Sequence, residues 1–219
     1  MTVEWTVVQV STAIGPARVH RFGPPGGRQP VGTLALGHGA GAGVEAVDLQ
    51  EVAAAVSAAA WQVLLVEQPW RVAGRRVAPA PARLDQAWIA VLDAVGRGLP
   101  GIGVTDRLVL GGRSAGARVA CRTALRLGAI GVCALAFPLH PPGRPERSRA
   151  AELAAAGMPV LVLQGGRDPF GGPAEVEAAI RHLQVADARV AEVPGDHGLA
   201  AGAVAAAALA AQWLGRLPR

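Results

Sequence analysis

Short apolar runs alternate with segments of helical spacing along most of the chain. We predict strands at residues 6–10, 17–22, 31–36, 63–66, 108–110, 132–136, 160–163 and 188–193. Apolar residues at helical spacing predict helices at residues 48–60, 84–95, 148–156, 174–183 and 199–214, and another from the turn at 111–116 to residue 127. The run at 63–66 is continuously apolar, as is typical of a strand buried on both faces.

This alternation predicts the fold class. Strands that alternate with helices form right-handed crossovers in a mostly parallel sheet. We therefore expect an α/β fold with a twisted, mostly parallel sheet and helices on both of its faces. The chain shows no internal repeat and no linker that would divide it, so residues 1–219 are expected to form one domain.

Composition excludes several function classes. Hydrophobic residues make up 51% of the chain and charged residues 17%, which excludes intrinsic disorder. All 21 basic residues are arginine, so P-loop chemistry, which needs a lysine, is excluded. The net charge of +5 fits either a GC-rich coding bias or a basic surface. Aromatic residues are only 4% and no predicted helix carries a basic stripe, so we expect no nucleic-acid partner.

Cysteine usage and hydropathy indicate a soluble, cytoplasmic protein. Cys121 and Cys133 lack the spacing of a disulfide framework or a metal site, so both are interpreted as small buried hydrophobic residues. Residues 1–5 show no basic region followed by an apolar run, so no secretory signal is expected. The most apolar stretch, residues 199–214, is shorter than the roughly 20 residues that a membrane span requires. No metal and no cofactor are predicted.

The sharpest motif lies between the strand at 108–110 and the helix that follows it. The segment Gly112-Arg113-Ser114-Ala115-Gly116 has the G-x-S-x-G pattern of a nucleophile elbow. The pattern alone is weak, and an ordinary glycine-rich turn is the alternative. Its position after a strand and before a helix is the one that the mechanism requires. Small residues at Gly112 and Gly116 allow the strained turn that would expose Ser114.

A nucleophilic serine needs a base and an acid that orients the base. Asp168 follows the strand at 160–163, and His197 follows the strand at 188–193. Both lie at carboxyl ends of strands, as Ser114 does, so the three side chains can converge. Asp196 adjoins His197 too closely to point into its ring, and Asp187 precedes the last strand at the opposite edge. His20 and His182 are interpreted as surface or packing residues.

The loop after the strand at 31–36 predicts the remaining part of the site. An oxyanion hole consists of two N–H groups aimed at the developing negative charge. Ala115 would supply one, as the residue after the nucleophile. Ala40, in the loop His38-Gly39-Ala40-Gly41, is our choice for the other, with Gly41 as an alternative. His38 is expected to shape this loop rather than to act as the base, and it is kept as a candidate substrate contact.

Taken together, these segments resemble the α/β-hydrolase superfamily. The resemblance runs from Gly37-His38-Gly39 through the elbow and residues 165–169 to Gly195-Asp196-His197. Within the superfamily the chain is similar to the small lidless branch related to dienelactone hydrolase. It is also similar to a compact domain in a subunit of a chromatin-acetylating complex. One departure is that dienelactone hydrolase uses a cysteine nucleophile, where this chain has Ser114.

The resemblance implies an open site without a cap domain, because the connection at 137–158 is too short for one. Two groups of arginines are expected at the rim of this site, because each follows the carboxyl end of a strand. The first group is Arg71, Arg75 and Arg76, and the second is Arg144, Arg147 and Arg149. They suggest a substrate with a carboxylate or phosphate, and solvated loop arginines are the alternative. Trp70, Arg71, Arg113 and His140 are further candidate substrate contacts.

The function expected from the sequence is hydrolysis of an ester-type bond in a small molecule. An anionic substrate is one of the options. Ser114, His197 and Asp168 would form the catalytic triad, and catalysis would pass through an acyl-enzyme. The alternative is a catalytically silent binding or scaffold domain on the same fold. The sequence leaves the oligomeric state open.

Overall fold

The computed structural model describes residues 5–102, 105–185 and 187–218. Residues 1–4, most of the segment searched for a secretory signal, lie outside the described residues. In the described part of the chain, eight strands form one sheet in the order β1-β2-β4-β3-β5-β6-β7-β8. The strands are β1 (Trp5–Thr12), β2 (Gly15–Phe22), β3 (Thr33–Gly37), β4 (Gln62–Glu67), β5 (Leu108–Arg113), β6 (Gly131–Leu135), β7 (Val160–Gly165) and β8 (Ala188–Val193).

The first two strands are antiparallel to their neighbours, and β4, β3, β5, β6, β7 and β8 are mutually parallel. All residues of β3 and β6 are buried, as expected for strands that are covered on both faces. The parallel strands place their carboxyl ends at one edge of the sheet. The loops that leave this edge carry the predicted site residues.

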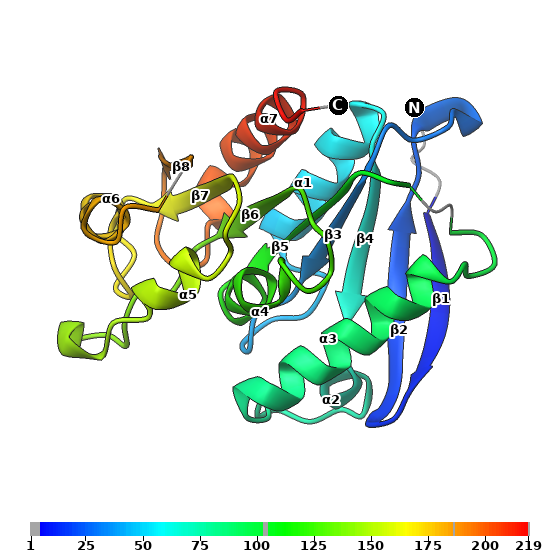
Figure 1. Cartoon of the computed structure of the whole chain (residues 1–219), viewed down its shortest axis with the longest axis horizontal. Helices are drawn as coiled ribbons and strands as arrows, with labels where there is room; N and C mark the ends of the chain where they lie inside the picture. The colour runs from blue at the N-terminus through cyan, green and yellow to red at the C-terminus, as the bar shows by residue number, and fades with distance from the viewer. Residues whose placement is uncertain (1–4, 103–104, 186, 219) are drawn as a thin grey trace.

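Helices cover both faces of the sheet (Figure 1). On one face α1 (Val47–Ala58) packs against α7 (Ala203–Leu214). The other face carries α3 (Pro81–Gly96), α4 (Ala115–Thr123), α5 (Ala150–Ala154) and α6 (Pro173–His182), while the short α2 (Pro69–Val72) contacts β2. Three 3-10 turns lie at Pro25–Gly27, Pro145–Arg147 and Ala200–Gly202. The predicted α/β class, with a mostly parallel sheet and no cap domain, is confirmed.

Several predicted boundaries were wrong. α4 ends at Thr123 rather than at residue 127, and the chain leaves it through turns to Gly128, whose φ is +65°. The last helix begins at Ala203, after a 3-10 turn. α2 was not predicted; it begins at Pro69, whose fixed φ suits the first position of a helix.

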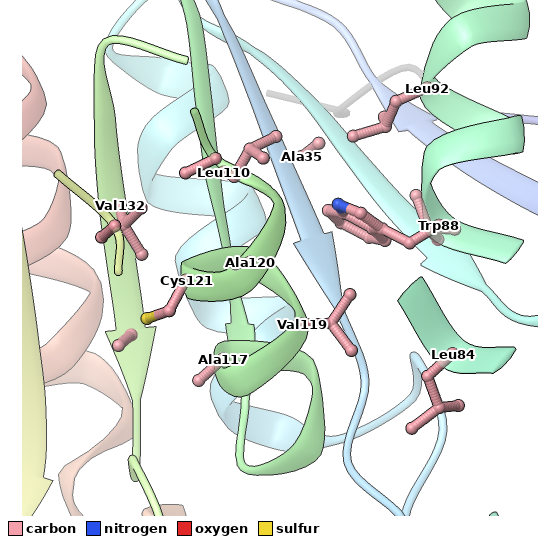
Figure 2. Close-up of a cluster of buried hydrophobic side chains, with 14 of the residues drawn as sticks. Ala35, Leu84, Trp88, Leu92, Leu110, Ala117, Val119, Ala120, Cys121 and Val132 are labelled. Carbon is pink, nitrogen blue, oxygen red and sulfur yellow. The ribbon is translucent and has the colours of Figure 1, made fainter. Parts of the chain in front are cut away.

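Two buried clusters, one on each face of the sheet, form the core. The apolar positions that predicted the helix at 84–95 are all buried in α3: Leu84, Ala87, Trp88, Val91, Leu92 and Val95. The ring of Trp88 points from α3 toward Ala35 of β3, beside Val119 of α4 (Figure 2). This side chain therefore fills the space between two helices and the centre of the sheet.

Both cysteines are free and buried, as the sequence predicts, and burial raises the pKa of each thiol to about 12. None of the described helices is long and apolar enough to cross a membrane.

We expect Trp88→Ala to destabilise the fold by about 3–5 kcal/mol, because it opens a cavity under α3 that the backbone cannot close. The matched control is Trp5→Ala, since the Trp5 side chain is 63% exposed; its effect should stay within about 0.5 kcal/mol. Equilibrium unfolding in urea measures both variants. Equal losses in the two would contradict the assignment of Trp88 to the core.

Candidate active site

Ser114 occupies a strained turn between β5 and α4. Its φ of 54° and ψ of −110° lie outside the regions that L-residues favour. The turn is possible because Gly37, Gly112 and Gly116 bring three backbones together. A Cβ atom at Gly112 or Gly116 would overlap the carbonyl oxygen of Gly37. The N–H of Ser114 donates to the Leu135 carbonyl at 2.9 Å, which ties the turn to the end of β6.

Three side chains from separate loops form one hydrogen-bonded chain at this edge of the sheet. Ser114 Oγ lies 2.9 Å from His197 Nε2, and His197 Nδ1 lies 2.8 Å from Asp168 Oδ2. An ionised Asp168 can only accept, so Nδ1 carries the ring proton and Nε2 accepts from the Ser114 hydroxyl. The Asp168 side chain is fully buried, while His197 is 19% exposed and reaches the cleft described below. The structure thus brings the predicted nucleophile, base and acid together.

The two alternative acids lie elsewhere. Asp196 Oδ1 accepts the N–H of Gly198 at 2.8 Å, within the loop that carries His197. Asp187 precedes β8 at the opposite edge of the sheet.

A buried polar network holds Asp168, and sequence reasoning missed it. Asp168 Oδ1 accepts the N–H of Phe170 at 2.8 Å, and Oδ2 accepts Gln164 Nε2 at 2.9 Å. Gln164 is fully buried, and its Nε2 also lies 2.7 Å from the carbonyl oxygen of Gly171. The Phe170 ring packs on the His197 ring with centroids 4.2 Å apart. The available signal was the single polar residue in the otherwise apolar run 160–164.

Arg113, in the variable position of the motif, links the site to α1. Its Nη2 donates to the carbonyl oxygen of His197 at 3.1 Å, and its Nε lies 3.0 Å from Asp48 Oδ2. The second contact is an ion pair without the alignment of a hydrogen bond. The Asp48 side chain is fully buried. Burial raises the pKa of Asp48, and the Arg113 guanidinium opposes part of that shift. Arg113 therefore holds the His197 loop by its backbone.

The predicted oxyanion donors lie beside Ser114. Ala115 is the first residue of α4, where N–H groups lack partners within the helix. Ala40 lines the same cleft, and the preceding Gly39 approaches so closely that a Cβ there would lie 3.6 Å from Ser114 Cβ. Both candidate residues therefore line the same cleft as Ser114.

His38 is a structural residue of this loop. It is buried, its Nε2 accepts the N–H of Gln68 at 3.2 Å, and its Nδ1 contacts the Gly39 carbonyl oxygen at 2.8 Å. Burial lowers the pKa of His38, so the ring is neutral and can make both contacts. It does not line the cleft within the described part of the chain.

The cleft above Ser114 has a volume of about 530 Å³, and the described elements form no cap domain over it. It is lined by Ala40, Gly41, Ala42, Arg113, Ser114, Ala115, Arg118, Pro138, Arg149, Phe170 and His197. Of the six arginines expected at the rim, all of them described, Arg149 alone lines it. β4, which precedes the first arginine group, is separated from β5 by β3, whereas β6 is the direct neighbour of β5.

The remaining candidate contacts lie away from the cleft. Trp70 is buried against His38, with ring centroids 5.4 Å apart, and lines a separate cavity of about 320 Å³ together with Arg75. Arg71 Nη2 lies 3.4 Å from Glu45 Oε1.

His140 pairs with α6 instead of facing Ser114. Its Nε2 lies 3.1 Å from Glu175 Oε2, and its Nδ1 lies 3.0 Å from the Pro141 carbonyl oxygen. These two acceptors raise the pKa of His140. Among the residues that the structure describes, no three His, Cys, Asp or Glu side chains are placed to share a metal ion.

Comparison with known proteins identifies the family and the fold of the chain. Residues 30–212 match the family described as alpha/beta hydrolase domain. No curated protein matches the chain in sequence. Dienelactone hydrolase from Anabaena variabilis has a similar structure, with a TM-score of 0.78 and 20% identity over 99% of both chains.

Two further solved structures are similar. An α/β serine hydrolase without a lid from Xanthomonas campestris gives a TM-score of 0.77 and 18% identity, covering 100% of this chain and 98% of that one. An esterase from Pyrococcus furiosus gives a TM-score of 0.78 and 15% identity, covering 98% of this chain and 92% of that one. The likeness to the chromatin-complex domain is not tested by these matches and stays a prediction. The sheet order, the lidless edge and the family match over residues 30–212 together show that the chain belongs to the alpha/beta hydrolase family.

Proposed function

We propose that this protein is a serine hydrolase that cleaves an ester bond in a small substrate. The observation that carries the proposal is the hydrogen-bonded chain from Ser114 through His197 to Asp168, which opens into a cleft that Ala115 and Ala40 also line. Nucleophile, base and orienting acid in this order are the requirements of acyl transfer.

In the first half of the reaction Ser114 Oγ attacks the ester carbonyl carbon and His197 Nε2 takes the hydroxyl proton. Negative charge develops on the carbonyl oxygen, where the N–H groups of Ala115 and Ala40 stabilise it. Asp168 stabilises the imidazolium and keeps its Nδ1 proton in place. The ester C–O bond then breaks, His197 returns the proton to the leaving oxygen, and an alcohol departs.

In the second half a water molecule attacks the acyl-enzyme. His197 accepts one proton from the water, the same N–H groups stabilise the second oxyanion, and the bond to Ser114 Oγ breaks. His197 then returns the proton to Ser114, and the carboxylic acid is released. The open cleft favours a short acyl group, because no cap encloses a long chain. Two of the similar structures are named as a dienelactone hydrolase and an esterase. These names support the proposal that the substrate is an ester.

We expect Ser114→Ala to lower kcat/KM for short p-nitrophenyl esters by at least about 10³-fold, since it removes the nucleophile. Covalent labelling by a fluorophosphonate should disappear with it. Ser11→Ala, at an exposed position of β1, is the control and should label as the wild type does. A wild-type protein that folds but neither labels nor hydrolyses any ester would favour the silent scaffold domain instead.

We expect Asp168→Asn to lower kcat by about 10³–10⁴-fold, because an amide donor facing Nδ1 favours the tautomer that cannot accept the serine proton. The matched control is Asp196→Asn, in which the new side chain can still accept the N–H of Gly198; kcat should change little. Steady-state kinetics on one short ester measures both. A larger loss in the control would assign the role of the acid to Asp196.

A further inference from the structure

The lining of the cleft is positively charged. Three arginines reach it, Arg113, Arg118 and Arg149, and no acidic residue is among the lining residues that the structure describes. Guanidinium groups that line one half-buried cleft repel one another, and a nearby carboxylate offsets this repulsion.

Two of the three have such a counter-charge. Arg113 pairs with the buried Asp48. Arg118 makes a bidentate pair with Glu152, through Nε at 2.8 Å and Nη2 at 2.6 Å. Glu152 Oε2 also accepts Arg122 Nη1 at 2.9 Å, and Arg122 has a second carboxylate partner in Asp85. These pairs neutralise the inner part of the cleft.

Arg149 has no such partner. Its Nη1 donates to the carbonyl oxygen of Pro138 at 3.0 Å, and no carboxylate in the described residues lies within ion-pair distance. Burial and the neighbouring Arg118 lower the pKa of Arg149, which the more distant Glu152 offsets only in part. A guanidinium carries five N–H donors in a planar fork, so most of its donors stay free of protein acceptors.

We propose that Arg149 forms an anion subsite beside Ser114, and that the ester substrate carries a carboxylate or phosphate group that binds there. The proposal rests on the proposed hydrolase function and names the substrate class. An oxyanion matches the free fork of Arg149 in shape and charge. It also supplies the counter-charge that Arg149 lacks, while the other two arginines already have theirs.

The test compares two esters that share a leaving group and a five-carbon acyl chain. One is p-nitrophenyl valerate, which is neutral, and the other is mono-p-nitrophenyl glutarate, whose acyl chain ends in a carboxylate. The spontaneous hydrolysis of each is subtracted. Because the reacting bond is the same, the ratio of the two kcat/KM values reports recognition of the anion and cancels any shared defect in the triad.

We expect the wild type to prefer the glutarate ester and Arg149→Gln to lower that ratio by at least about tenfold, as for a lost charge-assisted hydrogen bond. Arg149→Lys keeps the positive charge but lacks the planar guanidinium group. It should restore part of the preference for the glutarate ester, mainly through a lower KM for that ester. Arg144→Gln is the control: it removes one exposed charge from the same connection, outside the cleft, and should keep the wild-type ratio. High salt should reduce the preference of the wild type.

Labelling by a neutral fluorophosphonate separates this proposal from the function on which it rests. Labelling at Ser114 with equal ratios in wild type and Arg149→Gln would overturn the anion subsite and leave the hydrolase intact. Absence of labelling would overturn the hydrolase itself. Free glutarate and inorganic phosphate should slow labelling of the wild type but not of Arg149→Gln, and the stronger competitor identifies the preferred anion. Competition that is equal in both proteins would also overturn the subsite.

Discussion

The site depends on how closely the backbones of β3, β5 and α4 approach one another. A Cβ at Gly112 or Gly116 would collide with the carbonyl oxygen of Gly37, and a Cβ at Gly37 would press on the Cα of Gly116. This close contact lets the chain reverse at Ser114. The same contact places the loop after β3 beside Ser114. Trp88 supports the arrangement from α3, since its ring lies in van der Waals reach of position 37. The core residue Trp88 and the turn at Ser114 thus belong to one packed region.

The charged side chains at and behind the cleft have different kinds of partner. Asp168 accepts N–H groups of Gln164 and Phe170, which fix the orientation of its carboxyl group toward His197. Arg113 and Arg118 are held by carboxylates that lie outside the cleft lining. Among the described residues that line the cleft, Arg149 is thus the one arginine without a carboxylate partner.

The sheet and the three converging loops could be predicted because continuous apolar runs and chain order determine them. The order of the strands could not, and it decides which loops reach Ser114: β6 adjoins β5, so Arg149 does, whereas the group at 71–76 follows β4 on the far side of β3. Side-chain direction in loops was equally inaccessible, because no periodicity governs it. Trp70 is buried against His38, and His140 contacts Glu175. Neither direction could be predicted from the sequence. The roles of Gln164 and Asp48 depend on burial among distant elements, which local sequence does not encode.

The ion pair between Arg113 and Asp48 limits how the motif can be exchanged. The second position of a G-x-S-x-G segment is often treated as free, but here it carries the counter-ion of a fully buried acid on α1. Grafting a five-residue segment without this arginine would remove the guanidinium that opposes the effect of burial, so the pKa of Asp48 would rise further. The His197 carbonyl would lose its donor in the same step. Positions 48 and 113 thus form one unit of design and must be changed together.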